Sequence, residues 1–191
     1  MVTERTLVLI KPDGVQRSIS GKIISRFEDA GLKIVGMKMI WANDELARTH
    51  YPLDEEWAKK LFEKTKASYE KDNKPMKFKN HEEMGKIIQG NLILFLKESP
   101  VIAMVLEGPH AVELARKMIG STEPRQAAPG TIRGDFASIE SYAKADSKER
   151  AVRNLIHASD SPENAGREIS IWFSPLELHS YRTIHDLLLR E

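Results

Sequence analysis

The chemistry of this chain is predicted from a few cationic and hydroxyl side chains and one histidine, which stand in loops or beside apolar segments. Each is common as a solvated or structural residue, so the prediction depends on their combination. Ammonium, guanidinium and hydroxyl groups are suited to bind the oxygens of a triphosphate. A neutral imidazole has a free lone pair near pH 7, because its ordinary pKa is about 6.5. If they converge, these residues predict phosphoryl transfer to the histidine: Lys11, Arg116, Thr122, Arg133 and His157.

Other catalytic signatures are missing from the sequence. Gly14 and Gly21 are seven residues apart and Lys22 is followed by Ile23, so this segment is not a Walker A loop. The chain has no HExxH motif, EF-hand loop, GxSxG elbow or protein-kinase HRD and DFG pair. With no cysteine, it has no disulfide, thiolate metal site or cysteine nucleophile. Zinc proteolysis, α/β-hydrolase chemistry and dinucleotide binding are therefore excluded.

The composition is that of an ordinary globular chain of 191 residues, with 41% hydrophobic and 30% charged side chains. The formal net charge of +1 gives no electrostatic reason to expect nucleic acid or a membrane surface as a partner. No apolar run reaches the 18 residues of a spanning helix, and the first residues do not resemble a signal peptide. We expect a cytoplasmic protein that binds neither membrane nor nucleic acid.

The elements that would position these residues follow from apolar patterns. Apolar runs predict strands over 5–10, 32–41 and 101–106. Helical spacing predicts a helix after Ser20 and another after Asn43, which is a good N-cap. Residues 121–136 look like a long loop, and a short strand and a helix follow near His157 and Pro162, with Asp160 and Ser161 as candidate caps.

This order of elements predicts an α+β fold. An antiparallel four-stranded sheet covered by helices on one face fits best, in the form of a ferredoxin-like split βαβ sandwich. Between about 52 and 91 the composition shifts to lysine and glutamate around Trp57, Leu61 and Phe62, which indicates an inserted helical arm. The whole chain, 1–191, is interpreted as a single domain.

The chain resembles the nucleoside diphosphate kinases in four segments that occur in the same order: TLVLIKPDGVQR, GLKIVGMKMIWA, PGTIRGDF and NLIHASDS. The resemblance covers the first fifty residues and nearly all of 100–182. It implies ping-pong transfer of the γ-phosphate, mainly from ATP, to a nucleoside diphosphate through a phosphohistidine on His157. It also implies Mg²⁺, held mainly by the nucleotide phosphates, and a homo-oligomer that is a hexamer or a tetramer.

The resemblance also implies residue roles. Lys11, Arg116, Thr122 and Arg133 take the positions of the family's phosphate-binding residues, and Asn154 that of its ribose-side asparagine. By the same resemblance, three further residues surround the histidine, namely a packing tyrosine, a serine and a glutamate that orients the imidazole: Tyr51, Ser159 and Glu168. A carboxylate on the far ring nitrogen would fix the tautomer and stabilise the cation formed on attack. The other histidines match no catalytic position and are interpreted as structural or solvated: His50, His81, His110, His179 and His185.

Two segments depart from the family pattern. The arm at about 52–91 falls where the family has its base-stacking phenylalanine, so Trp57, Phe62 and Ile88 stay open as candidates. The connection at about 137–150 is lengthened. The arm is interpreted either as a lid over the nucleotide or as a surface used for subunit contacts. Two rival functions are a catalytically silent nucleotide-binding module and an RNA-binding ferredoxin-like domain, but the latter lacks an aromatic RNP-type strand.

Overall fold

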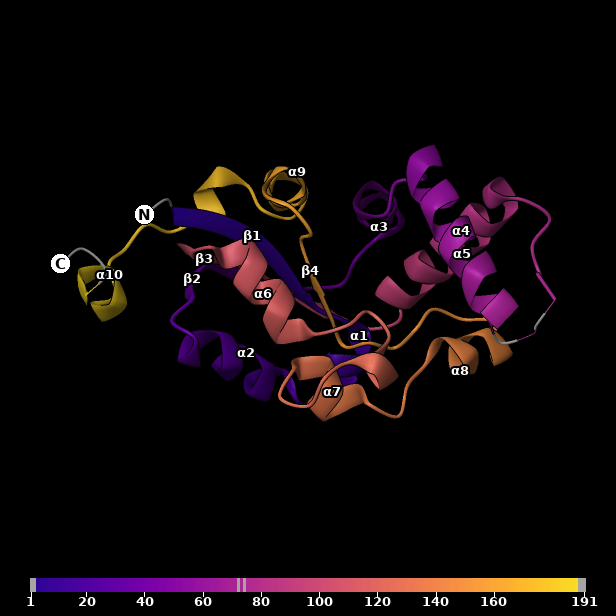
Figure 1. The fold of residues 1–191 in the computed structure, drawn as a ribbon. Coiled ribbons are helices and arrows are strands. Elements are labelled where there is room, and N and C mark those ends of the chain that lie inside the picture. Colours follow the sequence, from indigo (N-terminus) through magenta and orange to yellow (C-terminus); the bar gives the residue numbers. More distant parts are fainter. Residues whose placement is uncertain (1–2, 72, 74, 189–191) are drawn as a thin grey trace.

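The computed structural model describes residues 3–71, 73 and 75–188. Groups of helices separate the four strands along the chain, and the described part ends in a short helix (Figure 1). The elements are β1 Thr3–Ile10, α1 Pro12–Gln16, α2 Ser20–Asp29, β2 Lys33–Ile40, α3 Asp44–His50, α4 Glu55–Lys71, α5 His81–Leu96, β3 Val101–Pro109, α6 Ala111–Ile119, η1 Pro124–Gln126, α7 Ile132–Ala137, α8 Tyr142–Ser147, β4 Ile156–Ala158, α9 Pro162–Trp172, η2 Pro175–Glu177 and α10 Ile184–Leu188.

The sheet has four strands in the order β2-β3-β1-β4, and every pairing is antiparallel. The predicted α+β fold with a four-stranded antiparallel sheet is therefore confirmed. β1 lies between β3 and β4, so the end of β1 that leads into Lys11 runs beside β4. This arrangement brings the predicted lysine and histidine segments together although they are far apart in the sequence.

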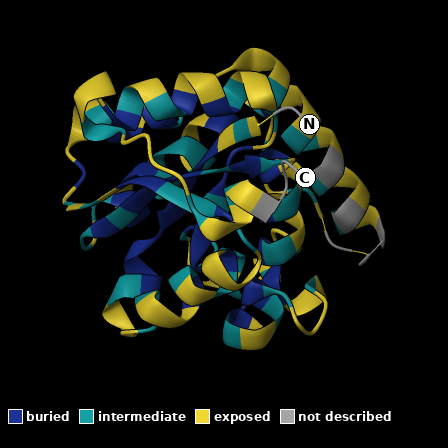
Figure 2. Cartoon of the chain, turned by 90° about the vertical axis from the view of Figure 1, so that its left-hand side faces the viewer, coloured by how far each residue is buried: buried dark blue, intermediate teal, exposed yellow. Residues whose placement is uncertain are grey.

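Helices cover both faces of the sheet, so the expectation of a single covered face was wrong. Val8 and Ile10 pack on one face with residues from α2 and α6, while Leu7 and Leu9 pack on the other with residues from α3, α5 and α9. Alternate residues of a strand point to opposite faces, and a run that is apolar at every position, as at 7–10, is typical of a sheet covered on both faces. Figure 2 shows the buried residues gathered between the exposed outer helices.

Polar caps start several helices, as the sequence predicts. The Asn43 side chain accepts a hydrogen bond from Leu46 N–H at the start of α3, and Ser161 accepts one from Asn164 N–H at the start of α9. The stretch expected to be a continuous loop, residues 121–136, instead contains η1 and most of α7. Thr131 caps α7 by accepting from Gly134 N–H, a signal that the surrounding proline and glycines hide.

The segments at about 52–91 and about 137–150 lie against each other. α4 and α5 pack side by side as an arm, and α5 runs to Leu96, beyond the expected boundary near 91. The Tyr69 hydroxyl of α4 donates to the Asp146 carboxylate of α8 at 3.1 Å. Lys77 Nζ donates to the Asp146 carbonyl at 3.4 Å. In Figure 1 this contact lies at the end of the molecule opposite α10.

The part of the chain that the structure describes contains no helix long and apolar enough to cross a membrane.

Candidate active site

The candidate nucleophile lies on the short strand β4, whose residue His157 pairs with Leu9 of β1. Its side chain is 22% exposed, so one side of the ring is accessible to a substrate. The other side faces α9, where Nε2 lies 2.9 Å from Oε2 of Glu168. The strand therefore fixes the backbone of His157 and the helix fixes its ring.

Glu168 is buried and holds two partners. The same Oε2 atom accepts a hydrogen bond of 2.6 Å from the Ser159 hydroxyl. Burial alone would raise the pKa of Glu168, but the hydrogen bonds from His157 and Ser159 outweigh it and lower the pKa. An ionised carboxylate only accepts hydrogen bonds, so Nε2 of His157 carries the proton. Nδ1 is then left with the lone pair.

Lys11 and Asn154 are in direct contact. Lys11 is buried at the end of β1, and its Nζ donates to Oδ1 of Asn154 at 2.8 Å. The Asn154 amide in turn donates to the Thr122 carbonyl at 2.9 Å. Burial, and next the charge of Arg133, lower the pKa of Lys11 to about 8, although Asp13 opposes this shift. A buried ammonium group has lost most of its hydration, and a bound anion can compensate for that loss.

Arg133 is also buried, and its guanidinium hydrogen-bonds two backbone segments, one after α6 and one just before His157. It donates to the carbonyls of Gly120, Asn154 and Ile156, at 2.8, 3.2 and 2.7 Å. Burial lowers the pKa of Arg133 to about 10, which leaves the side chain charged at neutral pH. Sequence reasoning placed Arg133 on the phosphates. The structure gives it a second role, in which it fixes the segment before His157.

The remaining predicted phosphate ligands, Arg116 and Thr122, are exposed. The positive charge of Arg116 is close enough to lower the pKa of Arg133. Tyr51 is half-buried, and its ring lies 4.5 Å from that of His50. Burial and next the negative charge of Glu168 raise the pKa of the Tyr51 hydroxyl, so it stays protonated and can donate a hydrogen bond.

Two residues near the site were not singled out by sequence reasoning. His50 is buried, and its ring stands edge-on to that of His157 at a centroid distance of 4.7 Å. Its Nδ1 accepts from Trp172 Nε1 at 3.3 Å, and burial holds its pKa well below the ordinary value. Phe95 is buried with Lys11 Nζ 5.8 Å from its ring centre. The adjacency of His50 to Tyr51 was the one sequence signal that pointed to the site.

The candidates for base stacking do not converge on one residue. Trp57 is half-buried and faces α5, because its Cζ3 lies 3.8 Å from the place where a Cβ on Gly85 would stand. Phe62 and Ile88 are also half-buried. Trp57 therefore packs within the arm, and a stacking role for Trp57, Phe62 or Ile88 stays a prediction.

The fold and this site define a class of protein. A histidine is hydrogen-bonded to a carboxylate and lies beside buried cations at the edge of an α+β sheet. This arrangement is typical of a phosphotransferase that works through a histidine. The family model of nucleoside diphosphate kinase matches residues 4–72 and 66–178. The chain belongs to the nucleoside diphosphate kinase family.

Relatives agree over nearly the full chain. A nucleoside diphosphate kinase of Pyrococcus horikoshii is 49% identical, over 94% of this chain and 90% of its own. The crystal structure of an NDP kinase from Pyrobaculum aerophilum has a TM-score of 0.88 and 43% identity, over 94% of this chain and 100% of that one. A transition-state mimic of nucleoside diphosphate kinase from Borrelia burgdorferi, with bound vanadate and ADP, has a TM-score of 0.79 and 35% identity, over 98% and 97%.

Proposed function

We propose that this nucleoside diphosphate kinase works by a ping-pong mechanism with His157 as the phosphate carrier and ATP as the main donor. In the first half, the Nδ1 lone pair of His157 forms a bond to the γ-phosphorus. The bond from that phosphorus to the bridging oxygen breaks, and the nucleoside diphosphate leaves with the electron pair. In the second half, an oxygen of another nucleoside diphosphate takes the phosphoryl group from Nδ1, which regains its lone pair.

The observation that carries this proposal is the 2.9 Å contact between Nε2 of His157 and Glu168. It occupies one ring nitrogen and leaves the other for attack. When Nδ1 forms a bond to phosphorus the ring becomes cationic, and the adjacent carboxylate stabilises that charge. Ser159 keeps the carboxylate in place from its other side.

Charge on the phosphates is the second requirement. We assign this charge to Lys11, Arg116 and Arg133, with a hydroxyl from Thr122 and an amide from Asn154. The contacts of Asn154 with Lys11 Nζ and with the Thr122 carbonyl support the assignment. The Borrelia burgdorferi relative was solved as a transition-state mimic with bound ADP and vanadate, which supports phosphoryl transfer with a nucleoside diphosphate as the leaving group. We assign nucleoside di- and triphosphates as the substrates of this chain.

Mg²⁺ fits the site as part of the nucleotide complex. Glu168 is bonded to His157 and Ser159, and Asp13 is bonded to Leu155 N–H; both carboxylates are buried. His50, His157 and Glu168 offer one ligand atom each within 4.8 Å of one another, but imidazole suits zinc or copper better than magnesium. The phosphate oxygens would therefore hold Mg²⁺, which neutralises their charge when bound.

The rest of the proposal concerns the assembly and its setting. We infer one domain over residues 1–191, in a cytoplasmic homo-oligomer that is a hexamer or a tetramer. Met37 and Met39 on β2, a strand at the edge of the sheet, and Trp41 directly after it are exposed, which supports subunit contacts there. Mass measurement in solution tests the oligomer.

Labelled ATP tests the mechanism. Incubation of the pure protein with γ-labelled ATP should give an acid-labile, base-stable phosphate on the peptide that contains His157. Addition of unlabelled nucleoside diphosphate should remove the label as triphosphate. A protein that binds ATP but gains no label would be a silent nucleotide-binding module, and the proposed carrier would be wrong.

A further inference from the structure

The segment just before the candidate nucleophile has an unusual backbone. Leu155 has a φ of 67°, in the left-handed region that favours glycine. Ile156 N–H donates to the Asn154 carbonyl at 2.7 Å, so Leu155 is the central residue of a tight γ-turn. With positive φ at the centre this turn is rare and strained. Leu155 is fully buried, and the turn separates Asn154 from the strand that carries His157.

Four further hydrogen bonds hold this turn. The Leu155 N–H donates to Oδ2 of Asp13 at 3.0 Å, and the Leu155 carbonyl accepts from Lys11 N–H at 2.8 Å. Arg133 donates to the carbonyls on either side, those of Asn154 and Ile156. A strained conformation persists only when its surroundings determine it, and this one is held at both polar groups of its central residue.

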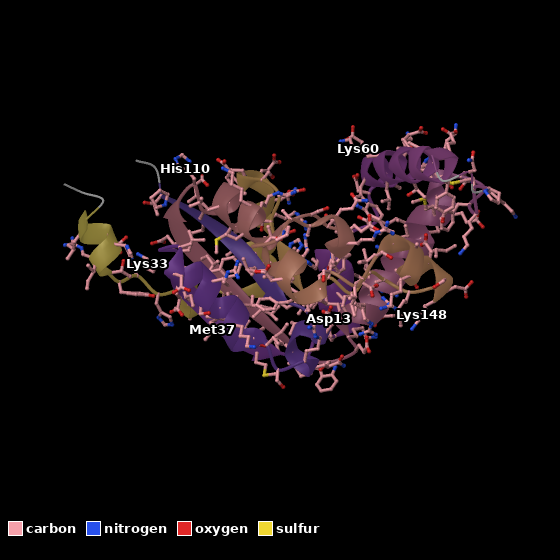
Figure 3. The ribbon with its side chains drawn as sticks, turned by 60° about the horizontal axis from the view of Figure 1, so that its bottom comes forward. Asp13, Lys33, Met37, Lys60, His110 and Lys148 are labelled. Atoms are coloured by element: carbon pink, nitrogen blue, oxygen red, sulfur yellow. The ribbon has the colours of Figure 1, made fainter. Side chains whose placement is uncertain are left out.

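Asp13 is the one anionic group among these contacts, and it lies in the interior. It stands in the first turn of α1, directly after the lysine segment, and is labelled in Figure 3. Its residue is 5% exposed, and its other oxygen, Oδ1, is buried with no hydrogen-bond partner among the described residues. Burial raises its pKa. A carboxylate is costly to bury, so its position calls for a compensating role.

The backbone around Asp13 is shaped for close approach. A Cβ on Gly14 would stand 3.3 Å from the Leu155 carbonyl oxygen and 2.7 Å from Cγ2 of Ile10. Glycine at this position therefore lets the first turn of α1 lie directly against the γ-turn. Three residues of this segment therefore contact Leu155. Lys11 donates its backbone N–H, Asp13 accepts through its side chain, and Gly14 has no Cβ that would clash with the Leu155 carbonyl.

We propose that Asp13 is a positioning residue for the phosphoryl transfer, because it holds Leu155 in the left-handed conformation that sets the places of Asn154 and His157. This inference rests on the proposed function of His157. Without the Asp13 acceptor, Leu155 would relax toward an ordinary φ. Asn154 Oδ1 would then move from Lys11 Nζ, and β4 would shift its pairing with β1. Asp13 itself touches neither substrate nor the reacting atoms.

A second reading gives Asp13 only the role of a counter-ion for Lys11, whose pKa it raises. Asparagine separates the two, because Asp13→Asn keeps an oxygen that can accept from Leu155 N–H but removes the charge. Asp13→Ala removes both. The positioning role predicts that Asn restores most of what Ala loses, whereas a counter-ion role predicts that both fail alike.

The first measurement is the single-turnover rate of His157 phosphorylation by Mg-ATP, with folded protein confirmed by circular dichroism. We expect Asp13→Ala to lower this rate about ten- to hundredfold, in line with the loss of a hydrogen bond to a charged group. Asp13→Asn should stay within about fivefold of wild type. Leu32→Ala is the matched control, because Leu32 is buried near Gly108, at the end of β3 away from the site. It should lower thermal stability and leave the rate intact.

A second comparison tests the turn itself and guards against misfolding of the Asp13→Ala variant. Leu155→Ala and Leu155→Gly both remove the buried side chain beyond Cβ, but only glycine adopts positive φ freely. When Asp13→Ala is added to each, the loss of rate should be at least about fivefold smaller on top of Leu155→Gly than on top of Leu155→Ala. Equal losses in the two double variants, or equal rates for Asp13→Asn and Asp13→Ala, would overturn the positioning role. If wild-type protein gains no phosphate at all, the proposed function fails instead.

Discussion

Nε2 of His157 and Oε2 of Glu168 are 2.9 Å apart, and this contact selects the nitrogen that can attack a phosphate. The carboxylate comes from α9 and the imidazole from β4, two consecutive elements joined by a short connection. Trp172 lies one helical turn beyond Glu168 and bonds His50, so one face of α9 orders both imidazoles. A change in α9 should therefore reach the ring of His157 without touching the phosphates.

The first prediction concerns the carrier. His157→Ala should abolish phosphotransfer and the phosphoenzyme while nucleotide binding stays largely intact, because the residues proposed to bind the phosphates are others. His185→Ala is the control, since His185 is exposed on α10. Activity and calorimetric ATP affinity are the measurements. Turnover above about 5% of wild type in a clean preparation would assign the nucleophile elsewhere.

The second prediction separates two arginines. Arg133→Ala should lower kcat by about 10²–10³, or about 2.7–4 kcal/mol, if its charge stabilises the transferring phosphoryl group. It should also lower Tm, because three backbone carbonyls, two of them in buried hydrogen bonds, lose their donor. Arg116→Ala, at an exposed position, should weaken ATP binding with little change in Tm. Arg133→Ala with only a higher KM and an unchanged Tm would contradict both roles.

These arginines also show how far the sequence predicts the site. Apolar runs place Lys11 and His157 at strands, and local polar caps such as Ser161 mark helix starts, because both signals are local. Two of the carbonyls that accept from Arg133 flank the left-handed turn at Leu155, a position with no glycine to indicate positive φ in the sequence. His50 reaches His157 because α3 packs on α9, a contact between segments more than a hundred residues apart. Such features depend on tertiary packing, which local sequence patterns do not predict.

The third prediction is the effect of pH on Lys11. Its lowered pKa of about 8 means that the ammonium form, the form proposed to bind phosphate, predominates below that pH and is lost above it. We expect kcat/KM for ATP, which reports the free enzyme, to fall as the pH rises through about 8. Lys11→Met should have a low kcat/KM without this limb. A wild-type profile that stays flat from about pH 7 to about pH 9.5 would argue against a titrating Lys11.

The fourth prediction is the effect of metal removal. If Mg²⁺ arrives with the nucleotide phosphates, excess chelator should abolish turnover but leave the Tm of the nucleotide-free protein unchanged. Added Mg²⁺ should restore turnover in full. A fall in Tm on chelation would point to a metal held by the protein itself, such as by His50, His157 and Glu168.

The last prediction tests whether the arm formed by α4 and α5 acts on the nucleotide. Gln89 Nε2 donates to the Tyr51 carbonyl at 2.7 Å, which ties α5 to the residue beside His50. The Tyr69–Asp146 hydrogen bond anchors α4 to α8. If the arm is a lid, Asp146→Ala should loosen it and raise KM for every nucleotide by about two- to tenfold, because an acceptor worth about 0.5–1.5 kcal/mol is lost.

Stacking and anchoring are separated by single substitutions in the arm. Trp57→Ala and Phe62→Ala each remove one candidate for the base, and a lid predicts that at least one of them raises KM with unchanged oligomer mass. Lys60→Ala is the control, because Lys60 is exposed and pairs only with Glu56 on its own helix among the described residues (Figure 3). If Asp146→Ala and both aromatic variants leave KM unchanged but alter the oligomer mass, the arm serves subunit contacts. In that case the contact between α4 and α8 stabilises the assembly and has no influence on nucleotide binding.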